Sequence, residues 1–153
     1  MTRSAEFKRA RDYAFRLLAV RSRSTKEVRD KLRLRKVVPE IISEVLEYLA
    51  GLNYLNDSEF CRQWIVSRLN KSLGLRRIRY ELRQKGVPCE IIEKQLGCCT
   101  ANYAEEDIVR LLIRQRLKKL AGADEKKAKV RVYAFLARRG FSPEIISEAL
   151  SQL

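Results

Sequence analysis

One pattern of acidic and apolar residues occurs three times in this sequence and constrains its fold more than any other feature. In each copy a glutamate precedes two isoleucines, and a leucine follows four residues later. The three glutamates are Glu40, Glu90 and Glu144, which sets a period of roughly fifty residues. Self-similarity at such a period is typical of tandem supersecondary units that bury their apolar faces against one another. The chain is therefore predicted to be an array of three copies of one module.

The spacing within each copy indicates helices. Upstream of each glutamate, two apolar residues stand four positions apart, as Val28 and Leu32 do in the first copy. Ser24 and Glu27 form a predicted capping box, and Pro39 can open the next helix because a first turn does not need its missing donor. The predicted fold class is all-α, an elongated and modular tandem array of three three-helix repeats. Their predicted limits are 1–52, 53–99 and 100–153.

Glycines and polar residues mark the expected helix ends. The opening helix of repeat one is expected over about 5–20. Asn56 and Asp57 are predicted to cap a helix that begins near residue 58, and Gly97 is predicted to end the last helix of repeat two. A short linker over 98–102 and a helix over roughly 103–121 should follow. Asp124 and Ser142 are predicted to cap the last two helices, with Gly140 ending the first of that pair.

The charge of the chain predicts an acidic partner. It carries 33 Lys and Arg against 19 Asp and Glu, a formal net charge of +14. Nucleic acid, a nucleoprotein complex and an acidic protein groove are all compatible with that excess. The charge is also segregated, because the second helix of each repeat is basic and the third is acidic.

Several functional classes find little support in the composition. There is no histidine, which removes the commonest general base, and the four cysteines show no zinc spacing. No phosphate-binding glycine loop or nucleophile motif occurs, so we expect neither an enzyme nor a bound metal or cofactor. Asp57 is interpreted as a helix cap and Trp64 as a core residue. The charged amino terminus and the absence of a long apolar run predict a cytoplasmic protein with no membrane contact.

The candidate binding residues are the cations of the second helices. In repeat two, a tyrosine, Tyr80, lies among arginines at helical spacing, and the equivalent position in repeat one is Asp30. The candidates are Lys26, Arg29, Arg33, Arg76, Arg79, Arg83, Lys127, Arg131 and Arg138. The competing interpretation is a solvated helix face held by ion pairs with the acidic third helices, since exposed pairs are common and contribute only about 0–1 kcal/mol. The excess of cations favours a binding role.

The central segment also resembles a known family. Its Tyr-Leu-Asn-Asp run over 54–57, followed by Phe60, Arg68 and Gly74 and by a Lys-Gly-Val run over 85–87, is similar to the signature of the RecX family of RecA regulators. The first repeat agrees with the family pattern at Arg21, Ser24, Glu27, Val28, Lys31 and Leu32. Val28 replaces the usual leucine, and the likeness is looser in repeat three.

This resemblance implies a function. It implies tandem three-helix repeats that bind the RecA filament on DNA and inhibit its recombinase, ATPase and coprotease activities, by blocking filament growth or promoting disassembly. Single- or double-stranded DNA is a possible second partner, and a monomer is expected. The alternative is a basic helical regulator that binds nucleic acid directly, although the acidic third helices argue against ordinary major-groove readout.

Overall fold

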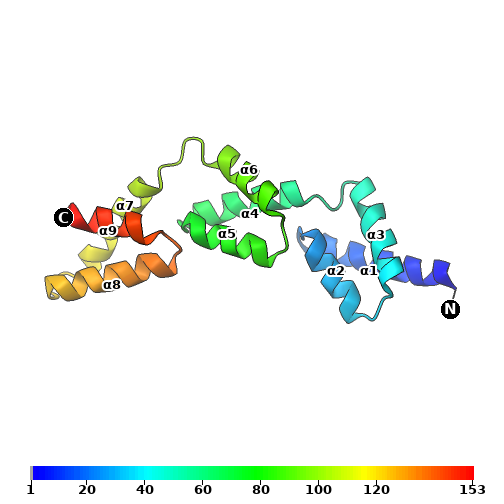
Figure 1. Cartoon of the computed structure of the whole chain (residues 1–153). Coiled ribbons are helices and arrows are strands. Elements are labelled where there is room, and N and C mark those ends of the chain that lie inside the picture. Colours follow the sequence, from blue (N-terminus) through cyan, green and yellow to red (C-terminus); the bar gives the residue numbers. More distant parts are fainter. Residues whose placement is uncertain (1) are drawn as a thin grey trace. The chain divides into compact units, whose positions relative to one another are not determined.

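The protein is all-helical. The computed structural model describes residues 2–153, and within that range it contains nine α-helices and no strand (Figure 1). The helices are α1 (Arg3–Val20), α2 (Thr25–Leu34), α3 (Pro39–Gly51), α4 (Asp57–Asn70), α5 (Leu75–Gln84), α6 (Cys89–Cys99), α7 (Glu105–Lys119), α8 (Glu125–Arg138) and α9 (Pro143–Ser151). The predicted all-α, modular fold class is confirmed.

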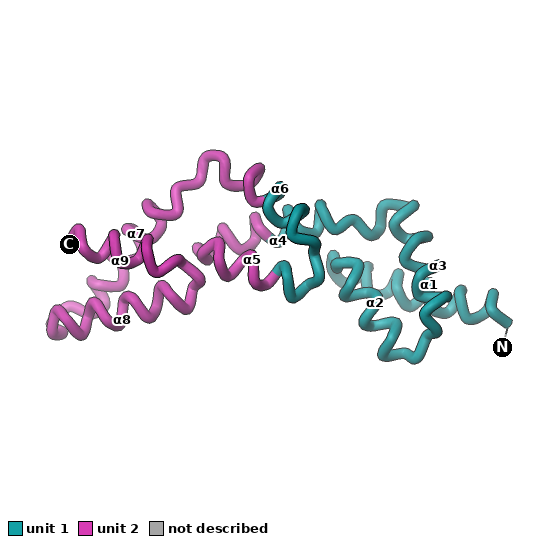
Figure 2. Tube along the Cα trace, in the orientation of Figure 1, with its two compact units in different colours: residues 1–64, 82–95 teal, residues 65–81, 96–153 magenta. Residues whose placement is uncertain are grey.

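The helices pack into two compact units (Figure 2). Unit 1 comprises residues 1–64 and 82–95, and unit 2 comprises residues 65–81 and 96–153. The division runs through α4, α5 and α6, so each unit holds a complete outer repeat and part of the central one. The repeat limits at 52 and 99 stay a prediction, because these units are groups of packed residues rather than repeats.

Unit 1 contains a three-helix bundle of α1, α2 and α3, each of which packs against the other two. Small residues of α1, Ala10 and Ala14, let it approach the apolar faces of the other helices closely. The core that they enclose comprises Ala10, Ala14, Val28, Leu32, Ile41, Ile42, Val45, Leu46, Leu49 and Leu55. Its members recur at three- and four-residue spacing, as the sequence predicts.

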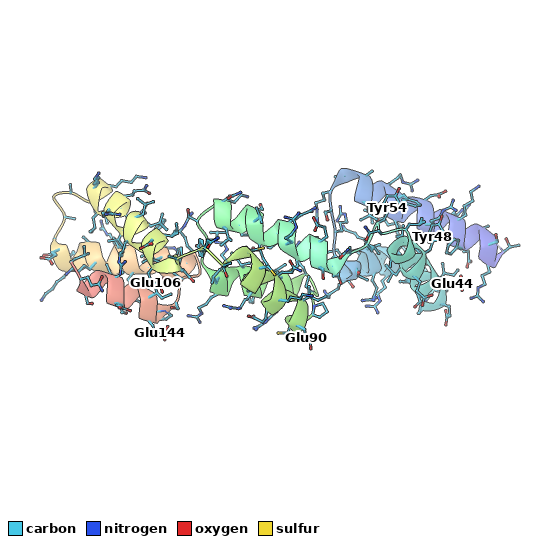
Figure 3. The ribbon with its side chains drawn as sticks, turned by 90° about the horizontal axis from the view of Figure 1, so that it is seen from above. Glu44, Tyr48, Tyr54, Glu90, Glu106 and Glu144 are labelled. Atoms are coloured by element: carbon cyan, nitrogen blue, oxygen red, sulfur yellow. The ribbon has the colours of Figure 1, made fainter. Side chains whose placement is uncertain are left out.

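Unit 2 contains the corresponding bundle of α7, α8 and α9. Its core comprises Val109, Ile113, Val132, Leu136, Phe141, Ile146 and Ala149. Val132 and Leu136 occupy the positions of Val28 and Leu32 in repeat one, and both pairs are fully buried. Two of the three glutamates that set the repeat period, Glu90 and Glu144, lie at the start of their helices. Their side chains are exposed and extend away from the ribbon (Figure 3).

The predicted caps are mostly correct. Ser24 Oγ accepts a hydrogen bond from the Glu27 N–H, and the Glu27 carboxylate accepts one from the Ser24 N–H, which completes the capping box. Asp124 and Ser142 cap α8 and α9. Gly140 follows α8 with φ +91°, a conformation that favours glycine.

Three helices have ends that differ from those expected. Gly97 does not end its helix but lies inside α6, which continues to Cys99, because a glycine interrupts a helix only weakly when the flanking residues continue the turn. The helix expected over roughly 103–121 spans only Glu105–Lys119, and α1 begins at Arg3 rather than at residue 5. The interpretation of Asp57 as a cap is also wrong: it is the first residue of α4, and Asn56 Oδ1 accepts the capping bond from the Glu59 N–H.

Candidate functional site

The candidate cations of repeat one lie on α2 and are partly neutralised there. Lys26 Nζ pairs with Asp30 at 3.1 Å, and Arg33 Nη1 pairs with the same carboxylate at 3.7 Å. Arg29 is half-buried, whereas Lys26 and Arg33 are exposed. Asp30 thus holds two of the three cations on their own helix, not against the acidic third helix that the competing interpretation requires.

The candidate cations of repeat two lie on α5, whose one acid, Glu81, pairs with Arg68 and Arg77, which are outside the candidate set. Arg76 and Arg83 are exposed and form no ion pair with any residue that the structure describes, while Arg79 is half-buried. Tyr80 occupies the position that Asp30 holds in α2 and is 63% exposed. Arg76 and Arg79 belong to unit 2 and Arg83 to unit 1. The α5 helix therefore carries an exposed cation without an ion pair among the described residues in each unit, Arg76 in unit 2 and Arg83 in unit 1, and an exposed aromatic ring, Tyr80, in unit 2.

The candidate cations of repeat three lie in the first half of α8 and at its last residue. Lys127 and Arg131 line a shallow hollow of about 290 Å³, together with Lys126 and the 69% exposed Val130. Arg138 lies at the other end of the helix, where its carbonyl accepts a hydrogen bond from Arg77 Nη1 at 3.5 Å. The structure thus brings Lys127 and Arg131 together and separates Arg138 from them.

Unit 1 also contains a junction that the sequence analysis missed. The first turn of α2 binds residues of the central repeat through three polar contacts. Ser24 Oγ donates to the Lys85 carbonyl at 2.6 Å, Asp57 Oδ1 accepts from the Thr25 N–H at 2.9 Å, and Lys85 Nζ pairs with Glu27 at 2.8 Å. Ser24 is fully buried. Asp57 therefore stabilises the start of a helix in the neighbouring repeat instead of its own.

Trp64 contributes to the same junction. It is half-buried rather than the core residue predicted from its spacing, and Lys85 Nζ lies 5.0 Å from the centre of its ring. A cation in this position is attracted to the aromatic face. The signal that could have revealed the junction is the pairing of opposite charges at Glu27 and Lys85, which are far apart in sequence.

Unit 2 contains a second junction of the same design, in which the first turn of α5 binds repeat three. The Gly74 N–H donates to the Arg139 carbonyl at 2.8 Å, and Glu105 Oε1 accepts from the Leu75 N–H at 3.4 Å. Arg139 donates to the carbonyls of Ser72 and Lys71 at 3.2 and 2.5 Å. Lys85 and Arg139 each precede a glycine with positive φ, Gly86 and Gly140.

The two junctions affect their acidic groups in opposite directions. Burial acts to raise the pKa of Glu27, but hydrogen bonds from Arg21, Lys85 and the Ser24 N–H outweigh it and lower the pKa to about 2. Burial raises the pKa of Glu105, with Glu106 adding to the effect, while the Leu75 N–H and Arg79 only partly oppose it. Glu27 is therefore held as an anion more firmly than Glu105.

The described residues contain no group of three or more acidic, cysteine or histidine side chains that could hold a metal ion. Cys61 is buried and Cys89 and Cys98 are exposed. Within residues 2–153 no helix is both long and apolar enough to span a membrane.

Comparison with protein-family models assigns each bundle. The first three-helix domain of RecX matches residues 10–49, the second matches 56–96 and the third matches 104–150. The chain belongs to the RecX family. The family resemblance inferred from the residues is thereby confirmed, and it extends over repeat three.

Curated relatives and solved structures agree with this assignment. The chain is 35% identical to Regulatory protein RecX of Prosthecochloris aestuarii, over 97% of this chain and 96% of that protein. It is 37% identical to Regulatory protein RecX of Amycolatopsis mediterranei, over 88% of this chain and 77% of that protein. The crystal structure of RecX from Lactobacillus salivarius has the same fold, with a TM-score of 0.84 at 22% identity over 98% of this chain and 97% of that one.

Proposed function

We propose that this RecX family member binds the RecA nucleoprotein filament and inhibits its recombinase, ATPase and coprotease activities, by blocking filament growth or promoting disassembly. The observation that supports this most directly is the surface of α5. On the part of α5 in unit 2, Arg76 is exposed without an ion pair among the described residues, and Tyr80, four positions later, is exposed as well. On the part in unit 1, Arg83 is likewise exposed without an ion pair among these residues. This surface suits a partner that offers both negative charge and flat or apolar groups, as a protein filament on DNA does.

The nine candidate cations have different roles in this proposal. Arg76, Arg79 and Arg83 supply the main contact to acidic RecA surface or DNA phosphate. Lys127 and Arg131 add a second contact on α8. Lys26, Arg29, Arg33 and Arg138 contribute less, because Asp30 already compensates two of them and Arg138 lies apart from the other cations of its helix.

The proposed activity is binding rather than catalysis. The arrangement needs no cofactor or metal, and a monomer in the cytoplasm, where the RecA filament forms, is sufficient for it. Inhibition would follow from occupying the filament surface, since a bound protein of this kind needs only to outcompete subunit addition or weaken subunit contacts.

The test is the hydrolysis of ATP by RecA on single-stranded DNA, with the full chain added well below the RecA concentration. Filament control predicts loss of hydrolysis at these low ratios. A protein that binds DNA directly would inhibit only when it saturates the DNA, and its inhibition would fall steeply with salt. That second outcome would replace the proposed function with the direct nucleic-acid-binding alternative.

A charge-reversal pair locates the surface. The double substitution Arg76→Glu and Arg83→Glu should raise the half-inhibitory concentration about tenfold or more, because two contacts become repulsive. The matched control is Lys94→Glu with Lys119→Glu, which changes the net charge equally at exposed positions outside the candidate set. Equal inhibition by the two variants would show that net charge, not the α5 surface, determines binding.

A further inference from the structure

Repeat one has a polar hollow on the surface formed by α1 and the turn that follows α2. Its volume is about 530 Å³, and Glu6, Tyr13, Arg35, Lys36 and Val37 are among its lining residues. The guanidinium of Arg35 lies 4.4 Å from the centre of the Tyr13 ring. None of these residues belongs to the candidate binding surfaces described above.

The hollow corresponds, residue by residue, to the faces that repeats two and three use in the two junctions. Each repeat has two buried residues four positions apart in its first helix, and an acid stands four positions before the first of them. The buried pairs are Ala10 and Ala14, Cys61 and Ile65, and Val109 and Ile113, and the acids are Glu6, Asp57 and Glu105.

The remaining parts of the face correspond in the same way. Three positions after the last buried leucine of the second helix stands a cation, which is Arg35, Lys85 or Arg139. Arg35 lies over Tyr13 as Lys85 lies over Trp64. The residue after the cation has positive φ in all three repeats. Repeat one therefore carries a third copy of a surface that is occupied twice elsewhere in the chain.

What occupies the two filled copies is in each case the first turn of a helix. The acid accepts from the backbone N–H of the first helical residue, Thr25 or Leu75, and the carbonyl of the cation accepts from the cap residue, Ser24 or Gly74. These donors are the N–H and cap groups that a helix start leaves without partners. Glu6 and the Arg35 carbonyl offer the same two acceptors.

The charges of the hollow select among possible helices. Arg9, Arg16, Arg35 and Lys36 line it, and of its two acids Asp12 is already paired with Arg11 at 2.9 Å. In unit 1 the equivalent cation Lys85 binds a carboxylate at the third position of the docked helix, Glu27. A docked first turn that carries a carboxylate is therefore favoured. The first turn of α8 in a second copy would bring Lys126 and Lys127 instead and would be repelled.

Lys36 adds a steric condition. Its counterpart Gly86 packs so closely on the docked helix that a Cβ there would lie 2.3–2.9 Å from side-chain atoms of Lys26. Lys36 has that Cβ, and the contacts include the Cβ of Lys26 itself, so the visiting helix needs a glycine where α2 has Lys26. We propose that the hollow binds the first turn of a helix of a protein partner, with glycine as its second residue and a carboxylate at the third. The identity of the partner rests on the proposed function, which makes the partner a subunit of the RecA filament.

Glu6 makes a nucleic acid the less favoured occupant, because a phosphate would be repelled where a helix N–H is attracted. This difference gives a decisive variant. Glu6→Gln makes the hollow more positive, so it should weaken binding of a helix start about tenfold but strengthen binding of a phosphate. Arg35→Glu should weaken binding of either. Lys31→Glu, an exposed cation of α2 outside the hollow, is the matched control.

The experiment uses two probes against the full chain. One is the RecA filament on single-stranded DNA, and the other is a lactam-stapled peptide that begins acetyl-Ser-Thr-Gly-Glu, measured by fluorescence anisotropy. The expected result is that Glu6→Gln and Arg35→Glu weaken binding of both probes about tenfold, while Lys31→Glu does not.

The other outcomes separate the proposals. A peptide that does not bind, or that binds Glu6→Gln as well as the unsubstituted chain, overturns the hollow as a helix site. Stronger filament binding by Glu6→Gln overturns it in favour of phosphate, and a dimer that Arg35→Glu dissociates overturns it in favour of a second copy. If the peptide behaves as expected but the unsubstituted chain does not bind the filament, the hollow stands and the proposed function fails.

Discussion

Both junctions bind the first turn of a helix to the neighbouring repeat, but they use different hydrogen bonds and ion pairs to do so. In unit 1 the carbonyl before the glycine turn accepts from a side chain, the hydroxyl of Ser24, whereas in unit 2 it accepts from a backbone group, the Gly74 N–H. The junction of unit 1 adds the Glu27–Lys85 ion pair. The junction of unit 2 has an arginine, Arg77, in place of the glutamate, and Arg139 donates to carbonyls instead.

The two junctions differ because the backbone segments that meet in them approach each other to different distances. A Cβ on Gly74 would lie 2.2 Å from the carbonyl carbon and oxygen of Gly140, so the two backbones in unit 2 approach more closely than any side chain permits. Ser24 keeps its side chain and uses it as the donor. The junction of unit 1 should therefore be sensitive to charge and pH, and the junction of unit 2 to the volume of its residues.

The largest effect should come from adding a methyl group to the glycine turns. In Gly140→Ala the new Cβ would meet the backbone and Cβ of Arg77 at 2.2–2.9 Å, with φ at +91°. We expect a loss of about 2–5 kcal/mol in the free energy of unfolding, measured with urea. Gly86→Ala should cost less, about 1–3 kcal/mol, because its Cβ would meet side-chain atoms of Lys26 and no backbone, and of these atoms the Cγ and Cδ can move aside although the Cβ cannot.

Gly51→Ala is the control for these glycine variants. Gly51 has nothing within 4 Å of its ideal Cβ and lies at the end of α3, so the substitution should be close to neutral. Equal losses for Gly86→Ala and Gly140→Ala would contradict the proposed difference between the junctions.

A smaller effect is expected when the charge of the first junction is removed. Glu27→Gln should destabilise unit 1 by about 1–3 kcal/mol, because Arg21 and Lys85 lose their charged acceptor. Hydrogen exchange of backbone amides should report faster opening around Ser24 and Lys85 and unchanged protection around Gly74. Glu47→Gln, at an exposed position of α3, is the control and should change neither region.

The smallest effect near neutral pH should come from the different pH ranges in which Glu27 and Glu105 change the free energy of unfolding. The pKa of Glu27 is lowered from 4.5 to about 2, so its contribution to stability is complete above about 4.5 and is lost as the pH falls toward 2. The pKa of Glu105 is raised, so its environment favours folding at low pH and this contribution is lost as the pH rises through its folded pKa.

Carboxyl-carbon NMR would separate the two groups. The midpoint for Glu27 should lie near 2, and that for Glu105 above its ordinary value of 4.5. Two midpoints close to 4.5 would mean that neither carboxylate is held in its junction as described.

Local interactions explain why much of the fold was predictable. The Ser24–Glu27 capping box, the caps Asp124 and Ser142, and the turn at Gly140 involve residues within a few positions of one another. The repeated spacing of buried residues depends only on the helix period. The helix end predicted at Gly97 is wrong because a single glycine carries little information once its neighbours continue the helix.

The candidate site was only partly predictable from sequence. Helical spacing places Arg76 and Arg83 on one helix, but which cations remain without an ion pair depends on where acids such as Asp30 lie in three dimensions.

The sequence alone determined the helices, most of their caps and the three-fold repetition, because these follow from hydrogen bonds and apolar contacts between near neighbours in the chain. Only the tertiary structure decided that Asp57 binds the start of α2, that Lys85 pairs with Glu27, and that Gly74 meets the turn at Gly140. These contacts join residues of different repeats. The physical reason is that a carboxylate or a glycine has many possible local roles, and only the packing of one repeat on the next selects among them.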